Sequence, residues 1–506
     1  METASKDISD EASSIEQRHA DAAEEVLPDH RSLYIGGSWV DSASGDSFET
    51  RDPTTGESLA SVAAGSSADI DDAVAAAWDA FDERFSEFST AERQAMLESI
   101  ADRVEANSEA FARLESLDNG KPISEARIDV SLVIDHFRYF AGAARTHEGT
   151  TVETDDSRHV QTLEEPYGVV GQIIPWNFPL LMAAWKLGPA LAAGNTVVLK
   201  PAEQTPLSIL KLMELTEDII PDGVVNVVPG LGEAAGAPLA SHDDIRKLAF
   251  TGSTAVGSEV MQSAAESITD VTLELGGKSP LVVFPDADLD AAVETAILAI
   301  FFNTGEVCCA GSRLFVHEDI EDQFLDQLAS AAADLTIGDP LLESTDLGPK
   351  VSADQLDRTL EYIERARDAD ATVLTGGSQP DDDSLADGCF VEPTLISDID
   401  HDHAAVQEEI FGPVQEIFTW SDYDAMIDLA NDVDYGLAAG VLTGDVSTAH
   451  ECAKDLEAGN VWINTYNDFP AGQPFGGYKQ SGIGRETAQD AVDHYTQTKT
   501  VTVGLQ

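Results

Sequence analysis

The sequence predicts an α/β protein with a parallel sheet and at least two domains, and three observations carry that prediction. The chain has 506 residues, more than one ordinary hydrophobic core accommodates. Its hydrophobic content of 43% is typical of a globular protein. Between residues 160 and 290, apolar runs of strand length alternate with helix-length segments, which is typical of βαβ units.

The predicted elements follow one another in regular order. A buried strand (Y-G-V-V-G-Q-I-I) is predicted over 167–174, a helix over 180–194 and a second strand over 195–200. Three more strands are predicted over 224–228, 247–252 and 270–275. Ligands of such sheets bind outside the carboxyl ends of the strands, so we expect a site where these strands end.

Five loops at those ends carry unusual residues. They are P-W-N-F-P (175–179), K-P-A-E (200–203), P-G-L-G-E-A-A-G (229–236), G-S-T-A-V-G (252–257) and E-L-G-G-K-S-P (274–280). Each of these loops can also be explained without a functional site. The glycine motif over 230–236 is one residue longer than a dinucleotide fingerprint. Ser253 or Thr254 is either a simple helix cap or part of a phosphate site at the same helix N-terminus. The convergence of five loops on one edge favours a site.

The charge of the chain is strongly acidic. Lys and Arg number 28 against 93 Asp and Glu, giving a net charge of -65. This excess argues against nucleic acids and anionic membranes as partners. An acidic surface over an ordinary core is the halophilic pattern, in which salt offsets self-repulsion. The acidic lead, residues 1–28, has little to bury, so we expect it to be loose.

The four cysteines are too few and too irregularly placed for a disulfide framework, which favours a reducing, cytoplasmic location. No apolar run follows a basic start, and no uncharged stretch has membrane-spanning length. We therefore expect neither a signal peptide nor a membrane span.

Two of the cysteines, Cys308 and Cys309, are adjacent in F-F-N-T-G-E-V-C-C-A-G-S-R (301–313). A buried structural cysteine is the usual explanation for any such residue. A disulfide between neighbours would be strained, and a zinc site needs a different spacing. A thiolate nucleophile at a glycine-containing turn remains. The candidate base is Glu274, at a strand end before two glycines.

Together these motifs, with E-E-I-F-G-P-V (408–414) and P-F-G-G-Y-K-Q-S-G-I-G-R-E (474–486), resemble the NAD(P)-dependent aldehyde dehydrogenase superfamily. The resemblance spans residues 29–506 in family order, and the spacing of Glu274 and Cys308 (308 − 274 = 34) is similar too. It implies a Rossmann-type cofactor domain, an α/β catalytic domain and a small oligomerisation sheet.

The resemblance also implies roles for individual residues. Cys308 would be the nucleophile with Cys309 a packed neighbour, Glu274 the general base, and Asn177 an oxyanion-hole donor. NAD would be the cofactor, because Glu203 would repel the 2′-phosphate of NADP. The cofactor-binding residues would be Trp176, Lys200, Glu203, Gly232, Ser253, Glu409 and Phe411. No metal is expected.

The implied reaction is oxidation of an aldehyde to the acid through a thiohemiacetal and a thioester on Cys308. Glu306 departs from the family pattern, in which glutamine is frequent. A carboxylate facing Cys308 would disfavour the thiolate, so we expect Glu306 to point away. Two alternatives from other classes are a cysteine-dependent esterase or hydrolase and a non-catalytic descendant of the fold.

The substrate funnel implied by the resemblance is mainly aromatic. Its residues would be Phe178, Met182, Trp185, Phe469 and Phe475, although core packing explains Met182 equally well. Aromatic walls suit apolar or aromatic aldehydes, and also quaternary ammonium aldehydes through cation–π contact. The segment N-T-Y-N-D-F (464–469) is similar to that of enzymes for amino or betaine aldehydes, and Asp468 would favour a cation.

The expected domain boundaries follow from the same resemblance. Residues 29–146 and 166–276 would form the NAD-binding domain and residues 277–480 the catalytic domain. Segments 147–165 and 481–506 would form the oligomerisation sheet, since T-K-T-V-T-V (498–503) is an edge-strand pattern that needs a partner. A homodimer or homotetramer is therefore expected.

Overall fold

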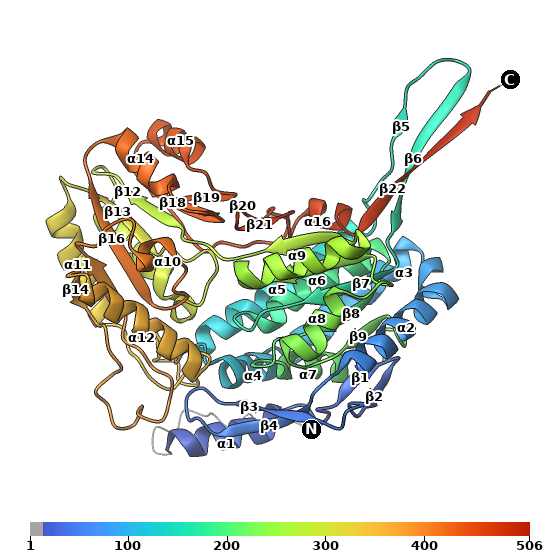
Figure 1. The fold of residues 1–506 in the computed structure, drawn as a ribbon, viewed down its shortest axis with the longest axis horizontal. Helices are drawn as coiled ribbons and strands as arrows, with labels where there is room; N and C mark the ends of the chain where they lie inside the picture. Colours follow the sequence, from blue (N-terminus) through green and yellow to red (C-terminus); the bar gives the residue numbers. More distant parts are fainter. Residues whose placement is uncertain (1–13, 506) are drawn as a thin grey trace.

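The computed structural model describes residues 14–505, which form two large sheets with helices packed on them and three smaller sheets (Figure 1). The first large sheet has eight strands. From edge to edge they are β2 (Ser38–Val40), β1 (Leu33–Ile35), β9 (Val225–Val227), β8 (Thr196–Lys200), β7 (Val169–Ile173), β10 (Lys247–Thr251), β11 (Asp270–Glu274) and β21 (Gly482–Ile483). The five strands from β9 to β11 are parallel, as the sequence predicts, so their carboxyl ends meet at one edge.

The central strands are apolar throughout because both of their faces are covered by helices. Val169 and Val198 pack into a core with α2, α8 and α9, whereas Val170 and Val197 pack into the core with α5 and α6. The helices on this half of the chain are α1 (Ile15–Val26), α2 (Ser67–Glu83), α3 (Thr90–Ala106), α4 (Ser108–Asn119), α5 (Ile123–Ala143), α6 (Pro179–Ala193), α7 (Leu207–Thr216), α8 (Ala237–Ala240) and α9 (Thr254–Ser267).

The second large sheet has seven strands, parallel except for the pair at one edge. In order they are β14 (Thr372–Thr375), β15 (Thr394–Ser397), β16 (Val414–Trp420), β13 (Arg313–His317), β12 (Pro280–Val283), β18 (Ala438–Leu442) and β19 (Asn460–Ile463). Its helices are α10 (Leu289–Phe301), α11 (Glu321–Ala333), α12 (Ala353–Asp368), α13 (Ala404–Gln407), α14 (Tyr423–Asn431) and α15 (Val446–Asp455).

Three smaller sheets complete the fold. Strand β22 (Thr496–Gly504) pairs antiparallel with β6 (Arg158–Pro166), which pairs with β5 (Thr151–Val152), and this sheet extends away from the body as an arm (Figure 1). Two further pairs are β3 (Ser47–Arg51) with β4 (Ser58–Ala63) and β17 (Tyr435–Gly436) with β20 (Tyr478–Lys479).

The segment that leads into the arm belongs to the body of the protein. Strand β21 pairs with β11 in the eight-stranded sheet, and α16 (Gln489–Asp493) packs against α6. The Ser481 hydroxyl donates to the Gly276 carbonyl over 2.7 Å, and the Leu275 N–H donates to the Ser481 carbonyl over 2.9 Å. The part of 481–506 before β22 is therefore built into the eight-stranded sheet and its helix layer.

The prediction that residues 1–28 are loose is wrong for the part that the structure describes. Residues 15–26 form α1, which the Ser14 side chain caps by accepting from the Gln17 N–H over 3.3 Å. The helix buries His19, Ala22 and Val26. It is ordered because its apolar side chains join the main core and its buried cations meet aspartates from distant segments. Residues 1–13 lie outside the described residues.

No helix within residues 14–505 combines the length and the apolar character that crossing a bilayer requires.

Few cations are left at the surface to balance the acidic groups. Within residues 14–505, six lysines are buried, and each forms an ion pair with a carboxylate. The pairs are Lys121–Asp129, Lys186–Glu486, Lys200–Glu203, Lys247–Asp270, Lys278–Glu416 and Lys350–Glu306. The exposed surface is therefore poor in lysine. Several arginines form surface ion pairs, as Arg103 does with Asp218 and Arg127 with Glu109, but 28 Lys and Arg cannot balance 93 Asp and Glu, so the remaining carboxylates repel one another.

We predict that transfer to dilute buffer inactivates the protein. At about 1 M salt the screening length falls to roughly 3 Å, which removes most repulsion between exposed carboxylates. Activity and Tm are measured after hours in dilute buffer, in molar KCl, and in sucrose of equal osmolarity. KCl should protect and sucrose should not, because the remedy is ionic. Full activity in dilute buffer would contradict a salt-adapted surface.

Candidate active site

One large cavity opens where the carboxyl edge of the eight-stranded sheet faces the second sheet. It encloses about 1150 Å³ of empty space including its open mouth. It brings together twelve of the residues predicted from the sequence: Trp176, Asn177, Phe178, Met182, Trp185, Ser253, Glu274, Cys308, Glu409, Phe411, Phe469 and Phe475. Lys200, Glu203 and Gly232 lie outside its lining.

Cys308 is carried by a sharp turn that follows α10. Asn303 and Thr304 have left-handed backbone angles (φ 48° and 53°), and Gly305 follows with φ 70°. A Cβ on Gly305 would lie 2.3 Å from the Gly412 carbonyl oxygen, so only glycine fits there. The turn leaves Cys308 partly exposed to the cavity and buries Cys309 completely.

The electrostatic surroundings of Cys308 hold its thiol in the protonated form. The adjacent Cys309 thiol, burial and the nearby Glu409 carboxylate raise the pKa of Cys308 well above its usual value. The Cys309 thiol lies 3.6 Å from the Asn467 side-chain oxygen and donates to it. Cys308 therefore needs a base or a bound cation before it becomes a nucleophile.

Asn177 is fixed beside the Cys308 turn. Its side-chain amide donates to the Glu306 backbone carbonyl over 2.8 Å, and the backbone carbonyl of Asn177 accepts from the Lys121 ammonium over 3.0 Å. Lys121 is fully buried and pairs with Asp129 at 2.5 Å. The side-chain amide of Asn177 has two hydrogens, and the Glu306 carbonyl takes one of them. Sequence reasoning missed Lys121, although a lysine in so acidic a chain is a signal in itself.

Glu274, the predicted general base, ends β11 and lines the cavity. The residue is 4% exposed, and neither of its carboxylate oxygens has a hydrogen-bond partner. Burial and the charge of Glu486 raise its pKa well above the usual value, while Lys186 opposes that shift. A Cβ on Gly476 would lie 2.6 Å from the Gly484 carbonyl oxygen and 2.9 Å from Glu274 Oε1, so the backbone requires glycine beside the carboxylate.

The neighbours that tune Glu274 come from far away in the chain. The Lys186 ammonium, from α6, lies 2.5 Å from a Glu486 carboxylate oxygen, and both side chains are buried. Sequence reasoning did not single out either residue for this role, because no local pattern links positions 300 residues apart.

Glu306 points away from Cys308, as the sequence analysis expects. Its carboxylate lies 2.7 Å from the Lys350 ammonium and accepts from the Val351 N–H over 3.3 Å. Burial raises the pKa of Glu306, and the Lys350 charge lowers it. The Glu306 charge is thus compensated by Lys350.

The predicted cofactor residues come from both halves of the chain. Trp176, Lys200, Glu203, Gly232 and Ser253 end or follow strands of the eight-stranded sheet, whereas Glu409 and Phe411 precede β16 of the second sheet. Lys200 Nζ is 3.0 Å from Glu203, and Ser253 caps α9 by accepting from the Val256 N–H over 3.3 Å. Glu409 accepts from the Gly277 N–H over 3.0 Å, and burial raises the pKa of Glu409 to about 7. The Trp176 and Phe411 rings meet edge to face with centroids 5.2 Å apart.

The glycine motif over 230–236 does not require glycine at each of its glycine positions. A Cβ on Gly232 would meet nothing within 4 Å, whereas one on Gly230 would lie 2.9 Å from both Ala235 Cβ and the Gly65 carbonyl oxygen. Close packing therefore requires glycine at position 230.

The far end of the cavity is aromatic. The Trp185 ring lies 5.4 Å from Phe475 and 6.3 Å from Phe469, measured between centroids. Met182 lines the cavity and also belongs to the core, so both explanations of that residue hold. Asp468 is exposed and is not part of the lining, so the structure gives it no direct contact with a substrate.

Comparison with known proteins identifies the family of the chain. The model of the Aldehyde dehydrogenase family matches residues 39–501. The chain belongs to this family.

Individual relatives are similar over nearly the whole chain. A mitochondrial benzaldehyde dehydrogenase of Antirrhinum majus is 48% identical over 478 residues, covering 94% of this chain and 89% of the relative. The NAD+ complex of the Bacillus cereus aldehyde dehydrogenase is 45% identical, with a TM-score of 0.93 and coverage of 96% and 98%. A Staphylococcus aureus betaine aldehyde dehydrogenase, also with NAD+, is 37% identical, with a TM-score of 0.94 and coverage of 96% and 97%.

Proposed function

We propose that the protein oxidises an apolar or aromatic aldehyde to the carboxylic acid with NAD as the cofactor. The observation that carries the proposal is the meeting of Cys308, Asn177 and Glu274 at one cavity with an aromatic far end.

The residues at the carboxyl edge fit a dinucleotide. Thr251 has a buried hydroxyl without a hydrogen-bond partner, and it lines the cavity beside the N-terminus of α9. That N-terminus suits a pyrophosphate. Lys200 and Glu203 would hold the adenosine ribose, and Glu409 with Phe411 the nicotinamide ribose. When bound, NAD+ accepts the hydride. The Bacillus cereus and Staphylococcus aureus structures contain NAD+, which supports this choice.

The chain's own groups carry the rest of the reaction. The Cys308 thiol would lose its proton to solvent, an ionisation that the positive charge of bound NAD+ would favour. The thiolate then attacks the aldehyde carbon, and the second amide hydrogen of Asn177 stabilises the oxyanion that forms. Loss of one such donor typically costs about 3–4 kcal/mol of transition-state stabilisation. Departure of the hydride leaves a thioester on Cys308. Glu274 then takes a proton from the water that attacks the thioester, which releases the acid.

An uncharged substrate is favoured by the electrostatics of the far end. Asp129 lines the cavity, but Lys121 at 2.5 Å neutralises it, and Asp468 faces elsewhere. Apart from Glu274 and Glu409, which also line the cavity, the walls therefore offer aromatic and aliphatic surface without an uncompensated carboxylate for a cationic aldehyde. The similarity to a benzaldehyde dehydrogenase agrees with this preference.

A panel of aldehydes tests the proposal. Benzaldehyde, an aliphatic aldehyde and betaine aldehyde are compared in molar KCl with NAD and with NADP, following the absorbance of the reduced cofactor. We expect kcat/KM for benzaldehyde to exceed that for betaine aldehyde by about tenfold or more. NAD should be preferred to NADP, because Glu203 would oppose a 2′-phosphate.

Three outcomes would contradict the proposal. A preference for betaine aldehyde would contradict the substrate class. Ester hydrolysis without reduction of NAD would favour a cysteine-dependent hydrolase. Inactivity of the folded protein on every substrate would favour a non-catalytic descendant of the fold.

We also propose a homodimer or homotetramer in the cytoplasm. Strand β22 is an edge strand of the arm, and Val152, Leu163 and Val503 expose apolar surface there. An exposed apolar edge of this length favours pairing with another copy.

A further inference from the structure

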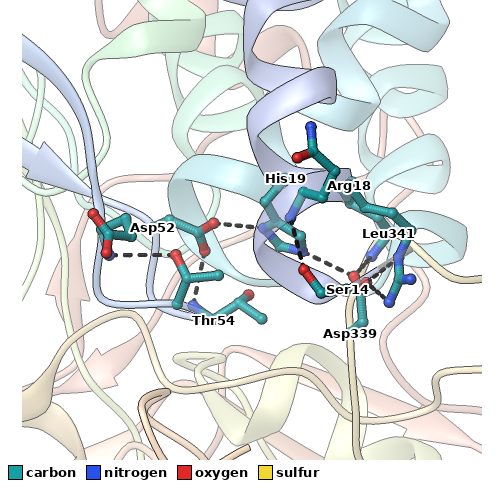
Figure 2. Close-up of polar contacts among 10 residues, drawn as sticks. Ser14, Arg18, His19, Asp52, Thr54, Asp339 and Leu341 are labelled. Atoms are coloured by element: carbon teal, nitrogen blue, oxygen red, sulfur yellow. Dashed lines mark hydrogen bonds and ion pairs between the residues drawn. The ribbon is translucent and has the colours of Figure 1, made fainter. Parts of the chain in front are cut away.

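Helix α1 contacts two distant parts of the chain through a buried charged cluster, and it precedes the range that the family model matches, which begins at residue 39. Figure 2 shows Arg18 and His19 of α1 with Asp52 and Asp339. Asp52 lies between β3 and β4, on the half of the chain that carries the eight-stranded sheet. Asp339 lies between α11 and α12, on the half that carries the seven-stranded sheet. The four residues lie apart from the lining of the active-site cavity.

The hydrogen bonds of His19 define its protonation. Its Nδ1 is 2.5 Å from Asp52 Oδ2, and its Nε2 is 2.9 Å from Asp339 Oδ1. An ionised carboxylate only accepts hydrogen bonds, so both ring nitrogens must carry protons. His19 is therefore an imidazolium although it is only 3% exposed. Burial lowers its pKa, but the hydrogen bonds to Asp339 and Asp52 outweigh burial and raise the pKa of His19 to about 9.

The charges within the cluster balance. Arg18 donates from Nε to Asp339 over 2.8 Å, so two cations meet two carboxylates. Each aspartate also fixes its own loop, because Asp52 accepts from the Thr54 N–H over 2.8 Å and Asp339 from the Leu341 N–H over 2.9 Å (Figure 2). Replacing either aspartate would disturb a turn as well as the cluster, which makes His19 the position to test.

Further charged groups surround the cluster at a greater distance. On α1 itself, Glu16 feels the charges of Arg18 and His19, and Glu25 pairs with Arg113 of α4 at 3.1 Å. Asp118, also on α4, has a pKa raised well above its usual value by burial, by Glu115 and by Asp52. The charge of His19 is thus compensated by Asp52 and Asp339, which contact it directly.

The segment that begins at Asp339, the partner of His19, contacts the turn that precedes Cys308. The Ile123 N–H donates to the Pro340 carbonyl over 2.8 Å. Further along the same segment, the Gly348 carbonyl accepts from the Thr304 hydroxyl over 3.2 Å, and Lys350 pairs with Glu306 at 2.7 Å. Residues 339–351 therefore link the cluster to the turn that carries Cys308.

We propose that α1 is a pH-dependent clasp between the two halves of the protein, held closed by the His19 imidazolium bridging Asp52 and Asp339. Loss of one ring proton removes the imidazolium charge and the histidine's hydrogen bond to one of the two aspartates, so the clasp weakens at alkaline pH although Arg18 still pairs with Asp339. His19 is a positioning residue that acts through segment 339–351. The proposal concerns stability and loop order, and it holds whichever substrate the cavity binds.

The sign of the pH dependence follows from linkage. A histidine whose folded pKa exceeds its unfolded value of about 6.5 stabilises the fold fully below that pH, and the contribution is lost as the pH rises through about 9. We expect His19→Gln to lower Tm by roughly 2–4 °C near pH 7 in molar KCl, and the difference from the unaltered protein to shrink toward zero near pH 10. His450→Gln, at an exposed position on α15, is the matched control and should change Tm at neither pH.

Hydrogen exchange locates the effect. Near pH 7, His19→Gln should expose amides in 339–351 and around Asp52 to faster exchange than the unaltered protein or His450→Gln shows. A Tm difference that is equal at both pH values would overturn the proposal, as would faster exchange confined to α1. If the variant fails to fold, the unaltered protein decides: protection of 339–351, corrected for intrinsic rates, should fall selectively between pH 7 and 10, and unchanged protection there would refute the clasp.

Discussion

Cys308→Ala is expected to abolish both aldehyde oxidation and ester hydrolysis, because both reactions require a covalent bond to the Cys308 sulfur. The side chain faces the cavity shared with Asn177 and Glu274, and alanine there leaves the turn intact. Cys309 also lines the cavity, but it is fully buried and its thiol donates to Asn467, so we do not expect it to replace Cys308. Residual turnover should fall to the background of the assay, by a factor of about 10³ or more.

Cys309→Ala is the matched control for this prediction. It removes a thiol one position away and should leave most of the activity. The neighbouring Cys309 thiol raises the pKa of Cys308, so its removal should shift the alkaline rise in activity to lower pH. Equal loss of activity in both variants, each folded by circular dichroism, would contradict the assignment of the nucleophile.

The strands of the first large sheet could be predicted because burial on both faces leaves a plain signal in the sequence. Each of β7, β8 and β10 is buried along its whole length, so the residues form apolar runs with turns at either end. Since those strands are parallel, the loops that follow them had to share one edge. The meeting of Asn177, Ser253 and Glu274 follows from that rule.

The remaining parts of the site depend on contacts that no local pattern records. Asn303 and Thr304 adopt left-handed backbone angles, which asparagine tolerates but which the β-branched threonine gives no reason to expect. Lys278 follows the strand predicted over 270–275, yet its buried ammonium lies 3.1 Å from the carboxylate of Glu416, on β16 of the second sheet. The order of α1 could not be predicted either, because its buried cations pair with Asp52 and Asp339, which are distant in the sequence.

Glu274→Gln is expected to separate the two halves of the reaction. Glutamine keeps the shape of the side chain, so attack by Cys308 and loss of the hydride should still give about one equivalent of reduced cofactor per site. Hydrolysis of the thioester then lacks its base, and steady turnover should fall by about 10²–10⁴. Rapid mixing should show a burst followed by a stall, and mass spectrometry should find the acyl group on Cys308.

The position of Glu274 also fixes the pH dependence of that step. Burial and the charge of Glu486 raise the pKa of Glu274 well above its usual value, so the ionised base accumulates only as the pH rises. Steady turnover of the unaltered protein should therefore increase with pH until Glu274 is ionised, whereas the residual rate of Glu274→Gln should lack that rise. Glu259→Gln, an exposed glutamate on α9, makes the same chemical change away from the cavity and should behave like the unaltered protein. Unchanged steady turnover in Glu274→Gln would exclude Glu274 as the base and leave its buried, unpartnered carboxylate without a catalytic role.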